Sequence, residues 1–317
     1  MFNDELFYHK VIIYLVIMLF QFFGFYGNIL LMKIHFDYKH LRTKYGLLLS
    51  SMVFNHTICL GSQSFNYIFG MRTWFTGNPP IRSTCSYYLS FSTVAICAQM
   101  CLLCAIAFDL VLCMVVPLRH RSLDTNLYVK ILWLPGLTSG VIFLVLTIAY
   151  ADDDVLIMCN PPYLIKEQWL SKWYFGFNIG LICLSALLYS SAYLVIAFKK
   201  DPTKTDAMYK LERRTLRTLK WLIIILVSSR LYSYIFINIM IWFHLEGSHL
   251  EIVKSYFGFL VMLSYSSNAY VCSFCSEEYR SLLVKSAPFM RFIFNGNGRT
   301  KSRTVGVSVV STKVFTS

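Results

Sequence analysis

Arg230 has the most distinctive chemistry in this sequence, because it is a charged residue inside a long apolar run. A charge at the centre of a membrane-spanning helix costs roughly 2.5–3.5 kcal/mol and normally faces a polar partner or water. Ser229, Ser233 and Tyr234 lie close to Arg230 in the sequence. Two interpretations remain open: Arg230 forms the polar floor of a pocket for an anionic or hydrogen-bonding ligand, or it is a structural residue held by carbonyls and water.

The other chemistry-bearing residues are not arranged for catalysis. Enzymes that act within a membrane need a nucleophile beside a base, or metal ligands that face one another. The apolar runs contain one central histidine, His56, and no paired acids, and the last run lacks an interior lysine for a Schiff base. We therefore predict that the protein is not an enzyme and has neither a cofactor nor a metal site.

Seven apolar segments divide the chain almost evenly and must position these residues. With 56% hydrophobic and only 14% charged residues, the composition does not suit one soluble core, in which about a quarter of residues are charged. Each segment is near the ~20 apolar residues that a helix needs to cross a bilayer, and is too long for a buried strand. We predict an all-α membrane protein, a seven-transmembrane helix bundle, with the spans Val11–Met32, Tyr45–Phe69, Tyr87–Val111, Val129–Tyr150, Trp173–Phe198, Trp221–Phe243 and Ser255–Ser276.

Basic residues alternate between the connections that join these spans. The connections after the first, third and fifth spans, and the region after the seventh, hold most of the 29 Lys and Arg residues. Because cytosolic loops retain basic residues, we predict an extracellular amino terminus and a cytosolic carboxyl terminus at the plasma membrane. The net charge of +13 then fits the anionic inner leaflet of the lipid bilayer, and no nucleic-acid partner is expected. Lys199–Lys200 and Arg213–Lys220 could meet an acidic partner or lipid, although topology alone would produce them.

Cys85 and Cys159 differ from the other eight cysteines, most of which lie inside apolar segments as small hydrophobes. The predicted topology places Cys85 where the third helix begins on the outer side and Cys159 in the connection between the fourth and fifth helices. Both face an oxidising compartment, and no other outer-loop cysteine competes for either. We predict a disulfide that pins this connection across the mouth of the bundle.

An outward-facing ligand pocket would lie between the third, fifth, sixth and seventh helices, a usual place for ligands in a bundle. The outer halves of the spans contain no acid, which disfavours an amine ligand. Similar residues also form interhelical hydrogen bonds without a ligand, and both interpretations remain open. The candidate lining residues are polar or could face inward: Ser92, Ile96, Gln99, Tyr189, Arg230, Tyr234, Tyr265 and Asn268.

Several short motifs occur in a fixed order along these spans. Gly27–Asn28 lies in the first span and Leu41–Arg42 precedes the second. Cys85, Asp109 and Pro117 then follow one another across the third span and the connection after it. These residues resemble the GN and LR signatures, the third-helix cysteine, the DRY motif and the second-loop proline of rhodopsin-like G-protein-coupled receptors.

Two further runs make the resemblance more specific. DDDVLIMCNPPY, from Asp152 to Tyr163, resembles the acidic turn and Cys-x-Pro-Pro motif of the nematode chemosensory class srsx. SNAYVCSFCSEEYR resembles the end of the family's seventh helix and its short amphipathic eighth helix. The match runs from about Gly24 to Arg280 and implies coupling to a heterotrimeric G protein, with activation or coupling roles for Asn28, Asp109, Leu110, Pro117, Arg119, Asn268, Tyr279 and Arg280.

The sequence departs from the family pattern at several positions. Leu110 stands in place of the DRY arginine, Ala269 and Cys272 replace the NPxxY proline and tyrosine, and Asn55–His56 replaces an acid that can hold sodium. Unlike an arginine, Leu110 can contribute apolar packing but no charge and no side-chain hydrogen bond. Reduced coupling, altered coupling and a non-signalling role therefore all remain open.

The sequence predicts one receptor domain over residues 1–294, followed by a polar, disordered cytosolic tail over 295–317. No linker or internal repeat divides the bundle. The expected function is that of a chemosensory G-protein-coupled receptor that binds an extracellular small molecule or peptide. The alternative is a non-signalling seven-helix membrane protein, or a ligand-gated channel or carrier, which would need several charged positions along a common path.

Overall fold

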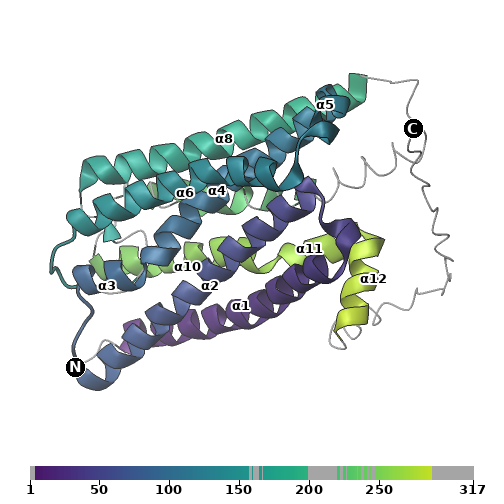
Figure 1. Ribbon diagram of the computed structural model, residues 1–317. Coiled ribbons are helices and arrows are strands. Elements are labelled where there is room, and N and C mark those ends of the chain that lie inside the picture. The colour runs from purple at the N-terminus through teal and green to yellow at the C-terminus, as the bar shows by residue number, and fades with distance from the viewer. Residues whose placement is uncertain are drawn as a thin grey trace, which may run out of the picture.

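The computed structural model describes residues 4–156, 159, 164–165, 167–198 and 247–287, together with some residues between 220 and 243. The described residues form an all-α bundle in which long helices lie side by side (Figure 1). This agrees with the predicted fold class. The helices are α1 (Asp4–Asp37), η1 (Lys39–Leu41), α2 (Lys44–Thr76), α3 (Arg82–Tyr88), α4 (Ser90–Val115), α5 (Pro117–Ser122), α6 (Thr125–Ala149), α8 (Gln168–Phe198), α10 (Gly247–Ser266), α11 (Asn268–Cys275) and α12 (Glu277–Ser286).

Over the described residues, the helices follow the predicted spans with two interruptions. The third span is divided at Leu89, between α3 and α4, and the seventh at Ser267, between α10 and α11. Residues 227–233 of the sixth span are helical. Among the described residues, four helices are long and apolar enough to cross a membrane by themselves: Val11–Asp37, Ser90–Val115, Thr125–Ala149 and Trp169–Val195.

The two ends of the bundle differ in the short helices that they contain. α3 lies near the amino terminus at one end, and α5 and α12 lie at the other (Figure 1). His40 of η1 lies 3.1 Å from Glu278 of α12, so η1 belongs to the second end. We call these the α3 end and the α12 end.

Local sequence signals set the ends of several helices. The Thr43 side chain accepts a hydrogen bond from the Gly46 N–H at 3.1 Å and so caps the start of α2. Gly77 ends α2 with φ of 70°, a left-handed conformation that favours glycine. Asp124 caps α6 through the Leu127 N–H at 2.7 Å. These caps fix where the chain turns between neighbouring helices.

α4 is the central helix of the bundle. In the most apolar 18-residue stretch of α4, 61% of the residues are buried, compared with 22% in the corresponding stretches of α6 and α8. Several apolar side chains of α6 and α8 are exposed, among them Ile142 and Leu187. Gly136 and Gly140 allow α6 to approach the α4 backbone closely. A Cβ atom at Gly136 would lie 2.8 Å from the Ala98 Cα, and one at Gly140 would lie 2.9 Å from the Val94 Cα. Small residues at such a crossing permit backbone contact between membrane helices.

Replacing Gly140 by valine is expected to separate α6 from α4, because the new side chain would overlap the α4 backbone. Overpacking of this kind typically costs about 1–3 kcal/mol. Thermal unfolding of the purified protein should show a lower melting temperature for Gly140→Val. Gly176→Val is the matched control, since a Cβ atom there meets nothing within 4 Å. Equal melting temperatures for the two variants would contradict the close crossing.

Candidate functional site

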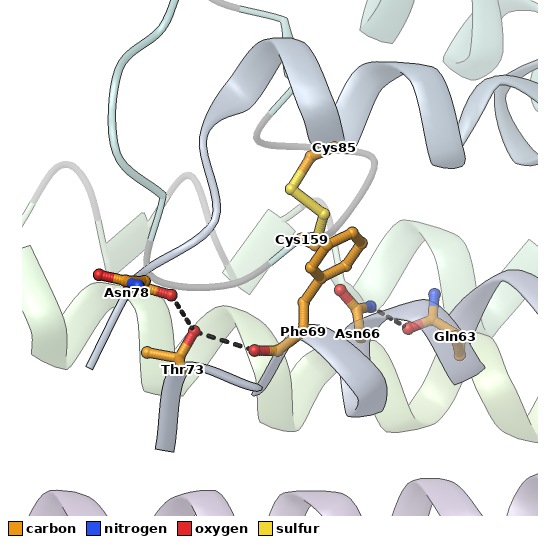
Figure 2. The surroundings of a disulfide bond; sticks show 7 residues. All are labelled: Gln63, Asn66, Phe69, Thr73, Asn78, Cys85 and Cys159. Carbon is orange, nitrogen blue, oxygen red and sulfur yellow. Dashed lines mark hydrogen bonds between the residues drawn. A yellow bond between two sulfur atoms is a disulfide. The ribbon is translucent and has the colours of Figure 1, made fainter. Parts of the chain in front are cut away.

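Cys85 and Cys159 form the predicted disulfide at the α3 end (Figure 2). Their Cα atoms are 5.5 Å apart, and both residues are buried. Phe69 lies beside the sulfur atoms and packs with Leu89 and Leu156 in a small apolar cluster. The disulfide therefore attaches the segment that follows α6 to the start of the third span.

The acidic run before Cys159 is bound to α3. Arg82 forms ion pairs with Asp152 and, at 3.2 Å, with Asp154, and the Ser83 hydroxyl donates to the Asp153 carboxylate at 2.6 Å. The Arg82 and Ser83 N–H groups donate to carbonyls of the same acidic run. Because these contacts occupy the three aspartates, the acidic turn has a structural role at the base of α3.

Tyr265 is the centre of a buried polar group in the middle of the bundle. Its hydroxyl accepts hydrogen bonds from Arg230 and, at 3.1 Å, from Gln99 of α4. The Arg230 guanidinium also lies over the Tyr265 ring, 5.1 Å from its centroid. All three residues are at least 95% buried. Tyr265 therefore links α4, the sixth span and α10 through one side chain.

The Tyr265 backbone continues this connection toward α1 and α2. Its carbonyl accepts hydrogen bonds from Asn28 at 3.0 Å and from Asn268 at 2.9 Å. The Asn268 amide also lies 2.8 Å from His56 Nδ1 and 3.2 Å from the Asn28 side-chain oxygen. Because the amide nitrogen donates, His56 Nδ1 is an acceptor and the ring proton is on Nε2. His56 thus occupies, as a neutral partner, the position where the family often has an acid.

The structure brings only part of the candidate pocket together. Gln99 and Arg230 both contact Tyr265, and along α4 toward the α3 end Ile96 is buried one turn and Ser92 two turns from Gln99. Tyr189 packs instead against the apolar cluster that contains Leu103 and Leu110, nearer the α12 end. Outside the described residues are Tyr234, Lys199–Lys200, residues 213–219 and the predicted tail over 295–317.

The coupling candidates on α4 and α5 lie at the α12 end. Asp109 is 4% exposed, and its carboxylate lies 2.7 Å from His120 Nε2. Leu110 is buried in the apolar core, as expected for a residue that supplies packing. Pro117 is the first residue of α5, where a missing N–H costs nothing, and Arg119 is exposed on the same helix.

The eighth-helix candidates fix the junction between α11 and α12. The Arg280 guanidinium donates to the Ser273 and Phe274 carbonyls, at 3.0 and 3.1 Å, and so caps the end of α11. The Tyr279 hydroxyl lies 3.0 Å from His35 Nε2 of α1. Burial raises the pKa of Tyr279, which keeps this hydroxyl protonated and able to donate. These contacts hold α12 across the end of α1.

Three residues with clear roles were not among the predicted site residues: His56, His120 and Lys44. The Lys44 ammonium donates to the His120 carbonyl and lies 5.4 Å from the Tyr128 ring centroid. The spacing between Asp109 and His120 offered a signal, because Pro117 begins a new helix that can turn His120 back toward α4. His56 offered a weaker signal as the central histidine of its span.

Among the described residues, no three His, Cys, Asp or Glu side chains come together as a metal site.

Residues 21–286 match the family model described as serpentine type 7TM GPCR chemoreceptor Srsx. The comparison with curated proteins found no match. The family match covers the bundle from α1 to α12 and confirms the resemblance seen in the motifs. The chain therefore belongs to the Srsx family of serpentine seven-transmembrane chemoreceptors, a class of G-protein-coupled receptors and not an enzyme family.

Proposed function

We propose that this chemoreceptor binds a small polar molecule or peptide from the extracellular side and signals to a heterotrimeric G protein through its α12 end. One observation carries the proposal: Tyr265 joins Arg230 and Gln99 through its hydroxyl and joins Asn28 and Asn268 through its carbonyl. A ligand that displaces the Tyr265 side chain would change contacts of α4 and of the sixth span together. Such a shared contact suits a two-state switch.

Two buried atoms near Tyr265 support a ligand with both donor and acceptor capacity. His56 Nε2, which donates, and Gln99 Oε1, which accepts, have no hydrogen-bond partner among the described residues. A buried polar group without a partner costs roughly 1–3 kcal/mol. A ligand hydroxyl can accept from the first and donate to the second, and Arg230 beside them favours an anionic group. Ser92, Ile96, Gln99, Arg230 and Tyr265 are the proposed contact residues, and Tyr234 is a further proposed contact.

The proposed coupling surface is α5. Leu118 is 82% exposed between Pro117 and Arg119, and Arg121 follows on the same exposed side. An exposed apolar residue followed by two cations suits a partner with an apolar pocket and acidic surroundings. The coupling surface is supported indirectly by residues that hold the ends of α4, α11 and α12, namely Asp109, Tyr279 and Arg280.

The orientation is a separate part of the proposal. The disulfide supports an extracellular α3 end, since disulfides persist in oxidising compartments. The exposed Arg119 and Arg121 support a cytosolic α12 end. An epitope tag fused after Ser317 is expected to stain only permeabilised cells. Staining of intact cells by this tag, with an amino-terminal tag hidden, would reverse the assignment.

A reporter assay tests signalling. Cells that express the receptor are exposed to pooled small molecules and peptides while second messengers and membrane currents are recorded. The proposal predicts a concentration-dependent second-messenger response. Ion flux that persists when G proteins are inhibited would favour a channel instead.

A further inference from the structure

α2 carries a pair of side-chain amides in its half nearer the α3 end. The Asn66 nitrogen donates a hydrogen bond to the Gln63 oxygen at 2.6 Å, one helical turn away (Figure 2). Asn66 is 3% exposed and Gln63 is half-buried. The Asn66 oxygen has no hydrogen-bond partner among the described residues. Because a buried acceptor without a donor costs roughly 1–3 kcal/mol, this atom points to a partner that is not part of the chain.

The two remaining atoms of the pair are turned the same way. Figure 2 shows the Asn66 oxygen and the Gln63 nitrogen on the side of the pair toward which Cys159 is drawn. Within the described part of the chain, Gln63 makes its one side-chain hydrogen bond through its oxygen, so its nitrogen is available to donate. The pair therefore offers one acceptor and one donor. Turning both amides over would exchange these atoms and leave the same combination.

The pair faces the interior of the bundle and not α1. The Gln21 side chain of α1 donates to the Leu60 carbonyl at 2.9 Å and to the Ser64 hydroxyl at 3.1 Å, so this side of α2 lies against α1. Asn66 follows Ser64 by two residues, which is about 200° around a helix. The Asn66 side chain therefore leaves the opposite side of α2.

The same face of α2 leads to the polar group around Tyr265. Cys59 lies seven residues before Asn66, and so on the same face, and it belongs to one apolar cluster with Ile96 and Tyr265. The amide pair is therefore one to two turns, about 6–10 Å, nearer the α3 end than this cluster contact. A ligand that enters from the α3 end would meet the pair before it meets Tyr265.

Aromatic rings border the pair. Phe65 and Phe69 of α2 both contact Tyr88 of α3, with ring centroids 5.5 and 5.3 Å apart. Phe69 is drawn between the pair and the disulfide (Figure 2). Ligand sites typically combine an apolar lining with a few placed polar groups, and these rings suit an apolar or aromatic group beside the atoms that the amides bind.

We propose that Gln63 and Asn66 form a subsite for a primary carboxamide: its NH₂ group donates to the Asn66 oxygen, and its carbonyl accepts from the Gln63 nitrogen. Peptides with an amidated carboxyl terminus and small aromatic amides both carry this group. The subsite rests on the proposed function only in that it serves a receptor entered from the α3 end. A carboxylate would bring an anion against the Asn66 oxygen, and an ester has no donor for it, so both are disfavoured.

Thermal unfolding of the purified full-length receptor in lipid nanodiscs tests the subsite without a G protein. The probes are N-acetylphenylalanine amide, its free acid and its methyl ester, which share one side chain and differ at the group that the subsite reads. A molecule that binds only the folded state raises the melting temperature. We expect the amide to raise it at millimolar concentration. The acid and the ester should bind at least about tenfold more weakly, which corresponds to about 1.4 kcal/mol.

Variants on the two sides of α2 separate binding from folding. Asn66→Leu and Gln63→Leu should each abolish the amide-induced rise. Without a probe, Asn66→Leu should melt no lower than the unaltered protein, because it removes a buried acceptor that lacks a donor. A structural Asn66 would make the same variant melt lower. Gln21→Leu is the matched control, since it removes an amide that faces the α1 side of α2 and should leave the amide-induced rise unchanged.

Equal rises with the amide, the acid and the ester would overturn the proposal. So would no rise with the amide, or a rise that persists in Asn66→Leu. Short peptides that end in phenylalanine amide, compared with the single amide, distinguish the two sources: tighter binding of the peptides indicates an amidated peptide, and equal binding indicates a small amide. If amides bind selectively but evoke no second-messenger response, the subsite stands and the proposed signalling fails.

Discussion

Removing the disulfide by the double substitution Cys85→Ala with Cys159→Ala is expected to cause the largest loss of folded receptor. The bond joins residues 74 positions apart and ties the segment after α6 to the start of the third span. A disulfide that closes a long loop typically contributes about 2–4 kcal/mol, mainly by restraining the unfolded chain. We expect most of the variant to remain inside the cell and the purified fraction to melt at a lower temperature.

The two readouts are surface staining by flow cytometry and thermal unfolding in detergent. Replacing both cysteines avoids a leftover thiol that could pair incorrectly. Cys183→Ala is the control, because Cys183 is a free, exposed cysteine on α8. Surface staining and melting temperature equal to those of the control would show that Arg82 and the acidic run hold the loop without the disulfide.

Tyr265→Phe is expected to have the second-largest effect, because it removes one oxygen that serves two donors. Arg230 and Gln99 both donate to this hydroxyl, and both are buried. Removing the acceptor of a buried donor's hydrogen bond costs about 1–3 kcal/mol, and more when the donor is charged. The melting temperature of the purified receptor should fall.

Arg230→Leu should act in the opposite direction on folding. It removes a charge that costs roughly 2.5–3.5 kcal/mol at the centre of a spanning helix, so folded yield should rise. In the Arg230→Leu background, Tyr265→Phe should have a smaller effect, since one of the two donors is gone. A lower yield for Arg230→Leu, with equal effects of Tyr265→Phe in both backgrounds, would mean that Arg230 is a structural residue whose contact with Tyr265 is secondary.

The spans and the family could be predicted because they depend on local properties of the sequence. Run length and hydropathy define spans such as Ser90–Val115, and the order of short motifs indicated the family. The disulfide could also be predicted, because topology left Cys85 and Cys159 as the outer pair. Each of these predictions needed only the order of residues along the chain.

The contacts between helices could not be predicted in the same way. The bond between His120 and Asp109 depends on how the chain turns at Val116, and that turn is set by backbone bonds formed after α4 ends. The contacts of Asn268 with His56 and of Tyr265 with Arg230 depend on helix rotation, which a sequence with apolar residues on all faces does not fix.

The most direct test of the receptor account is the second-messenger response of the unaltered receptor and of Tyr265→Phe, compared at matched surface density against a ligand found in the screen. Matching the surface density removes differences in folding. We expect a saturable, G-protein-dependent response in the unaltered receptor and a weakened or right-shifted response in Tyr265→Phe. Identical dose-response curves for the two proteins, or a response that persists when G proteins are inhibited, would contradict it.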